Sequence, residues 1–201
     1  MITWTRVLAG RWKDPLVARD VLIGLLVGLG YNLVFAASDV LEMGPGAVSA
    51  RTYLDTLLGI QRTSSIVLNR VSVGLAAALL FFLLFFVMRF ILRKEWLAGI
   101  AFVLFFILGR VIGSANPAIT VTSYIIVYGI IVFMLLRCGV LSLVATIFVT
   151  DLVPEILFTT NFSAWYGTGS LFVIALVVGL SILAFRYALG SQRPWAELLD
   201  R

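Results

Sequence analysis

The sequence predicts an all-α, polytopic helical membrane protein with six transmembrane helices. Hydrophobic residues make up 62% of the 201 residues and charged residues 12%, whereas soluble domains have about 45–50% and about 25%. The apolar residues fall in long runs separated by short polar turns, and the basic residues are concentrated on alternate turns. One soluble core of this size cannot hold so much apolar surface, so most of it is expected to face lipid.

Two residue types that often carry chemistry are almost missing. The chain has no His, and Cys138 is its single Cys. Imidazole is therefore excluded as metal ligand, general base or axial haem ligand, and an intrachain disulfide is excluded as well. The net charge of +5 is interpreted as charge distributed across a membrane, and no nucleic-acid partner is predicted.

Residues 1–20 are predicted to be a cytoplasmic, interfacial and amphipathic lead-in. Four apolar residues have the spacing that places them on one face of a helix, with Arg11 and Lys13 off that face: Trp4, Val7, Leu8 and Trp12. Asp14 and Pro15 suit the cap and first turn of a following helix. Charges before the first apolar run are unlike a cleaved signal peptide, so that run is expected to remain as an anchor.

Residues 21–188 form the predicted membrane domain, followed by a cytoplasmic tail at 189–201. The six spans are expected at about 21–37, 71–92, 96–113, 118–136, 140–152 and 168–187. Gly24 and Gly28 in the first span make a small-xxx-small pattern, which we expect to serve packing within the chain rather than dimerisation. The long polar connection after this span is expected to contain an outer-surface helix at about 47–61.

The basic residues predict the orientation of these spans. With both termini in the cytoplasm, the inner segments hold eleven Lys and Arg residues: Arg6, Arg11, Lys13, Arg19, Arg89, Arg93, Lys94, Arg137, Arg186, Arg193 and Arg201. The outer segments hold four: Arg51, Arg62, Arg70 and Arg110. This asymmetry follows the positive-inside rule, and each inner turn agrees with it separately.

An outer polar site is the first candidate for function. Charged and amide side chains near the ends of spans are costly to bury in hydrocarbon and are often functional; those here are Asn32, Arg110, Asn116, Asp151 and Glu155. A pair between Arg110 and Asp151 would let each tolerate a partly dry site, and Glu155 is a second candidate partner. A pocket with Asp151, Glu155, Asn32 and Asn116 could admit a cation or a small polar ligand. In the alternative interpretation the charges are solvated or reach the headgroups.

Enzyme signatures are lacking in the sequence. It has no His-Glu-x-x-His helix, no Gly-x-Ser-x-Gly elbow and no phosphate-binding Gly-x-x-x-x-Gly-Lys-Ser/Thr loop. No catalytic residue, metal ligand or cofactor is therefore predicted, and a bound membrane lipid is left open. We expect the protein not to be an enzyme.

A cytoplasmic docking surface is the second candidate site, between Gly10 and Asp20, the densest group of charges in the chain. Its residues are Arg11, Trp12, Lys13, Asp14, Arg19 and Asp20. The stretch from Leu8 to Leu22 resembles the entry to the C-terminal membrane region of certain bacterial serine/threonine protein kinases. Three later segments are similar to landmarks of the same region: residues 136–141, 162–166 and 185–190.

The kinase Gly-rich loop, Lys and catalytic Asp do not precede this stretch. The resemblance therefore implies a stand-alone copy of a multi-pass anchor or sensory module in the bacterial inner membrane. It would work without catalysis through other membrane or cytoplasmic proteins, or as a homo-oligomer. Two alternatives stay open, namely an accessory subunit of a larger transport or energy-conversion complex, and a small solute or ion carrier.

Overall fold

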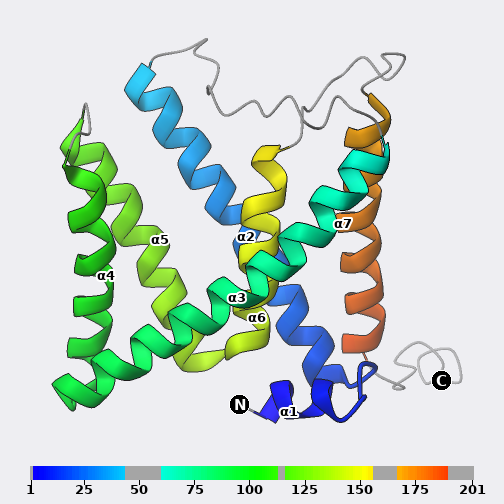
Figure 1. Cartoon of the computed structure of the whole chain (residues 1–201), viewed down its shortest axis with the longest axis horizontal. Coiled ribbons are helices and arrows are strands. Elements are labelled where there is room, and N and C mark those ends of the chain that lie inside the picture. Colours follow the sequence, from blue (N-terminus) through cyan, green and yellow to red (C-terminus); the bar gives the residue numbers. More distant parts are fainter. Residues whose placement is uncertain (1, 44–59, 113–115, 156–166, 190–201) are drawn as a thin grey trace, which may run out of the picture.

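A computed structural model describes residues 2–43, 60–112, 116–155 and 167–189, and all its regular elements are helices (Figure 1). In chain order they are α1 (Ile2–Leu8), α2 (Pro15–Met43), α3 (Ile60–Leu92), α4 (Glu95–Val111), α5 (Pro117–Arg137), α6 (Val140–Leu152), the 3-10 turn η2 (Val153–Glu155) and α7 (Gly167–Ala188). The described ranges contain no strand.

Within the described residues, four helices are long and apolar enough to cross a membrane. The qualifying segments are Pro15–Leu41, Gln61–Leu92, Pro117–Arg137 and Thr168–Ala188. The remaining two predicted spans correspond to α4, with 17 residues, and α6, with 13. Both are shorter than the roughly 20 residues that usually cross a bilayer.

Successive helices from α2 to α7 run in alternating directions (Figure 1). As a result, α1, the start of α2, the α3–α4 turn, the α5–α6 turn and the end of α7 lie along the lower edge of the view. The three helices that end at this edge each carry a basic residue in the last turn: α3 has Arg89, α5 has Arg137 and α7 has Arg186. The last turn of α4, which ends at the opposite edge, carries Arg110. Positive charge is therefore gathered on one side of the bundle.

The short helix α6 is the most enclosed element of the bundle. It packs most extensively against α2 and also contacts α3 and α5. Eight of its 13 residues are buried: Val140, Ser142, Leu143, Thr146, Ile147, Phe148, Val149 and Leu152. The Ser142 hydroxyl donates to the carbonyl of Gly139, and the Thr146 hydroxyl donates to the carbonyl of Ser142. Because both hydroxyls are satisfied in this way, they can be buried among apolar side chains.

Two glycines let α2 approach α6 at backbone distance. A Cβ atom at Gly24 would lie 2.6 Å from the Cβ of Ala145, and one at Gly28 would lie 2.8 Å from the carbonyl oxygen of Thr146. The hydroxyl of Thr146 also donates to the carbonyl of Gly24 over 3.1 Å. The small-xxx-small pattern therefore serves packing within the chain, as predicted.

Aromatic rings fill the space between α3, α4 and α5. Phe102 is fully buried, and its ring meets Phe81 edge to face at a centroid distance of 5.9 Å. Phe106 stacks on Tyr128 with centroids 4.5 Å apart. α5 is also joined to α2, because the hydroxyls of Ser123 on α5 and Ser38 on α2 form a buried hydrogen bond of 2.5 Å.

Several predicted boundaries differ from the structure. α2 covers Pro15–Met43 rather than 21–37, and α3 begins at Ile60 rather than 71. Polar residues such as those at 61–65 continue a helix readily when no Gly or Pro interrupts it, so hydropathy alone places the ends too far inward. The predicted outer-surface helix at 47–61 lies outside the described residues except for its last two, which belong to α3.

The structure bears on two local expectations for residues 1–20, namely the shared helical face and the start of the next helix. α1 ends at Leu8, and Gly10 follows with a φ of 75°, so Trp12 does not continue the face of Trp4 and that part of the prediction is wrong. The predicted start of the next helix is confirmed, because α2 begins at Pro15 and the backbone N–H of Leu16 donates to Asp14 Oδ1 over 3.0 Å.

Replacing Gly24 with Ala should destabilise the protein, because the new methyl group would overlap Ala145 and the α6 backbone. Overpacking of this kind costs about 1–3 kcal/mol, so the midpoint of thermal unfolding in detergent should fall. Gly30→Ala is the matched control, since nothing lies within 4 Å of a Cβ there. Equal midpoints for the two variants would contradict the close α2–α6 contact.

Candidate functional site

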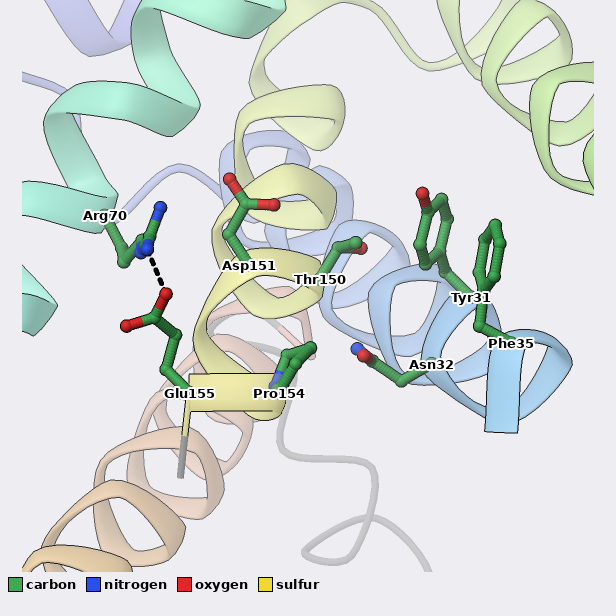
Figure 2. A pocket seen from close by; sticks show the side chains of 8 residues that line it. All are labelled: Tyr31, Asn32, Phe35, Arg70, Thr150, Asp151, Pro154 and Glu155. Atoms are coloured by element: carbon green, nitrogen blue, oxygen red, sulfur yellow. Dashed lines mark hydrogen bonds and ion pairs between the residues drawn. The ribbon is translucent and has the colours of Figure 1, made fainter. Parts of the chain in front are cut away.

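A polar pocket opens where α2, α3, α6 and η2 meet (Figure 2). Its volume is about 190 Å³, which is smaller than the roughly 300–1,000 Å³ of sites for drug-sized ligands. The lining residues are Tyr31, Asn32, Phe35, Arg70, Thr150, Asp151, Pro154 and Glu155. Charged and amide groups are thus collected at one place in a bundle that is otherwise strongly apolar.

An ion pair between Arg70 of α3 and Glu155 of η2 closes one wall of the pocket (Figure 2). The Glu155 side chain is 8% exposed and that of Arg70 is 24% exposed. Pro154 has no N–H to extend the hydrogen-bond ladder of α6, so the chain tightens into the 3-10 turn that carries Glu155 toward α3. Burial in apolar surroundings makes either charge costly without the other.

Asp151 and Thr150 supply the middle of the pocket from the last turn of α6. Within the described ranges, no ion pair includes Asp151. The Thr150 hydroxyl and Arg70 Nε are buried and have no hydrogen-bond partner among the described residues. Two polar atoms of residues that line the pocket therefore lack a hydrogen-bond partner among the described residues.

The α2 wall is fixed by a side-chain bridge between two helices. Asn32 Nδ2 donates to the carbonyl of Gly28 over 2.9 Å and to that of Val149 over 3.4 Å. Tyr31 and Phe35 lie beyond Asn32, with ring centroids 4.8 Å apart (Figure 2). The pocket thus has an ionic wall on α3 and η2, and an aromatic wall on α2.

Of the five residues predicted for the outer polar site, the structure brings three together in this pocket: Asn32, Asp151 and Glu155. Arg110 lies in the last turn of α4 and Asn116 precedes α5, and neither lines the pocket. The ion pair at the pocket joins Arg70 to Glu155, and within the described residues no ion pair joins the candidate partners Arg110 and Asp151. The sequence prediction missed Arg70 because it placed this residue in a loop, whereas it belongs to the early turns of α3.

Only some residues of the predicted cytoplasmic surface are exposed, and the others are paired or buried within the chain. Arg11, Trp12, Lys13 and Arg19 are exposed, with Trp12 at 68%. Asp14 instead forms an ion pair with Arg6. The hydrogen bond from the Leu16 backbone and the nearby Arg6 lower the pKa of Asp14, so it stays ionised at neutral pH.

Asp20 does not belong to the exposed surface, because it is 2% exposed. It bonds the neighbouring Arg19 over 3.3 Å. Burial raises the pKa of the Cys138 thiol, and the nearby Asp20 carboxylate adds to this effect. Asp20 therefore lies beside the α5–α6 turn, where Gly139 adopts a φ of 94° that favours glycine.

Comparison with protein-family models, with curated proteins and with solved structures finds no match to this chain. Within the described residues, no group of three or more His, Cys, Asp or Glu side chains could hold a metal ion.

Glu155→Gln should destabilise the protein strongly, because it leaves the Arg70 charge without its partner in a mostly buried site. Breaking a buried ion pair from one side costs about 3–5 kcal/mol. Glu95→Gln is the matched control, because Glu95 pairs with Arg89 at a site where the two side chains are 57% and 51% exposed, and such pairs contribute about 0–1 kcal/mol. Thermal unfolding in detergent measures both, and similar losses would contradict a special role for the buried pair.

Proposed function

We propose that the chain is a non-catalytic sensor or anchor module of the bacterial inner membrane that works through partner proteins. The polar pocket would be its sensing site. The observation that carries the proposal is the collection of Arg70, Asp151 and Glu155 in one small pocket of an apolar bundle. Ionisable groups are costly at such places, and they usually mark a site of ligand or ion recognition.

The proposed topology has six membrane segments, with the N- and C-terminal ends of the chain in the cytoplasm. The alternating helix directions in Figure 1 and the basic residues on the lower edge support it. α6 is short for a bilayer, but it is enclosed by α2 and α3 and has little contact with lipid. A helix shielded in this way does not need the length of a lipid-facing span.

α6 offers a physical route between the two sides of the membrane. Its C-terminal turn holds Thr150 and Asp151 in the pocket. Its N-terminal end follows the α5–α6 turn, beside Asp20 near the start of α2. A ligand that displaces the end of α6 would move the other end against α2, because tightly packed helices shift as units.

The partner would meet the exposed cytoplasmic residues Arg11, Trp12, Lys13 and Arg19. The resemblance to the membrane region of bacterial kinases favours a signalling protein in this role. A solute carrier is the second candidate, favoured by the charged groups of the pocket.

A photo-crosslinking amino acid in place of Trp12 tests the proposal in living cells. We expect one defined cytoplasmic protein to be captured, since Trp12 is exposed beside two basic residues. The same amino acid at the exposed position Asn116 is the control, and charge reversal by Arg11→Glu with Lys13→Glu should abolish the product.

Purification as a monodisperse monomer, with no captured protein at position 12, would contradict the proposal. Substrate flux in proteoliposomes that is lost on Asp151→Asn would instead favour the carrier. Capture of a transport ATPase or redox subunit would favour an accessory role in a larger complex.

A further inference from the structure

The turn between α3 and α4 carries an excess of positive charge. Residues 89–96 contain three bases and one acid, and the acid, Glu95, forms an ion pair with Arg89. Arg93 and Lys94 are both exposed, and no ion pair within the described residues includes either of them. Two adjacent cationic side chains of this turn are therefore available to an anionic partner.

Arg93 has a backbone conformation that usually favours glycine. Its φ is 57°, and the other two residues with positive φ in the described ranges are Gly10 and Gly139. A Cβ atom makes this conformation unfavourable. The N–H of Arg93 donates to the carbonyl of Arg89 over 2.9 Å, and glycine could make the same bond. The backbone therefore does not account for Arg at this position, and the exposed side chain is the part that can serve a function.

The turn lies at one corner of the lower edge of the bundle, where the diagonal helix α3 ends (Figure 1). Apolar side chains on both sides of the turn are exposed: Phe90 by 78%, Ile91 by 69% and Trp96 by 62%. Trp is typical of the boundary between hydrocarbon and headgroups. Bases next to an exposed apolar surface are the combination that binds at a membrane interface.

A phospholipid with a net negative headgroup complements both parts of this surface. Its phosphate can accept two hydrogen bonds from an Arg guanidinium and can meet a Lys ammonium as a point charge. Its acyl chains cover the apolar side chains. A zwitterionic lipid has the same phosphate but adds a cation that the two bases repel. A soluble anion would meet the bases alone and would leave the apolar side chains in water.

We propose that the α3–α4 turn binds anionic phospholipid headgroups of the leaflet that it faces. Arg93 and Lys94 contact the headgroup phosphate, Trp96 lies at the level of the headgroups, and Phe90 and Ile91 lie among the acyl chains. This inference goes beyond the proposed function, because neither the polar pocket nor the surface around position 12 takes part in it.

Quenching of Trp96 fluorescence by brominated phospholipids tests the proposal on the full chain in lipid bilayers. The signal comes from Trp96 alone when Phe replaces the other four tryptophans, which are Trp4, Trp12, Trp165 and Trp195. Bilayers of fixed composition carry bromine on the acyl chains of either phosphatidylglycerol or phosphatidylcholine. We expect a preference of about 30-fold for phosphatidylglycerol at Trp96, because each base near a membrane surface contributes about 5-fold.

Two substitutions remove the bases one at a time. Arg93→Gly should lower the lipid preference by about 5-fold, whereas the midpoint of thermal unfolding should not fall, because glycine suits the positive φ. Lys94→Gln should lower the preference by the same factor. Lys13→Gln is the matched control with unchanged preference, because Lys13 is an exposed base between α1 and α2 and outside this turn.

Equal quenching by the two brominated lipids would overturn the proposal. A preference that survives both substitutions would also overturn it, since other bases would then hold the anionic lipid. Absence of quenching by either lipid would place Trp96 outside the bilayer and would replace the lipid by a soluble anionic partner. Capture of a partner at position 12 would still report separately on the proposed function.

Discussion

The close contact between α2 and α6 is the constraint on which the other features of this bundle depend. Gly24 and Gly28 remove the side chains that would hold the two helices apart. The helices come close enough for Thr146 to bond the carbonyl of Gly24 across the interface. A 13-residue helix is thereby held inside the bundle, although it is too short to match the bilayer by itself.

The position of α6 determines where the polar pocket forms. Its last turn and the following η2 bring Thr150, Asp151 and Glu155 to the space between α2 and α3. Asn32 then joins α2 to the end of α6 through the carbonyls of Gly28 and Val149. The Arg70–Glu155 pair balances charge on the remaining wall, so a charged site is tolerated in an apolar bundle. The C-terminal end of α6 therefore both packs against α2 and carries part of the candidate site.

Much of the fold follows from periodicity and hydropathy alone. Each predicted span overlaps a helix of the structure, and α2 begins at Pro15, where the cap residues predicted it. Helix ends are less predictable, because polar residues at 61–70 extend α3 beyond its hydrophobic run. The structure has four helices that qualify as membrane-crossing by length, whereas hydropathy also marks the shorter α4 and α6 as spans.

The site was predictable only in part for a related reason. Asn32, Asp151 and Glu155 stand out in the sequence as polar residues at the ends of apolar runs. Which basic residue joins them depends on how α3 crosses α6, and no local pattern distinguishes Arg70 from Arg110 in this respect. Likewise, the spacing of charges around Asp20 does not reveal that its side chain is buried beside the α5–α6 turn.

Disulfide cross-linking of α2 to α6 measures the central contact most directly. With Cys138 replaced by Ser, the pair Gly28→Cys and Val149→Cys would place two Cβ atoms in direct contact, since a Cβ at Gly28 lies 2.8 Å from that of Val149. A small shift of the helices gives the separation of about 3.5–4.5 Å that a disulfide requires. We expect rapid loss of both thiols on mild oxidation, and none for Gly30→Cys with Val149→Cys, because nothing lies within 4 Å of a Cβ at Gly30. Equal cross-linking of the two pairs would contradict the burial of α6 against α2.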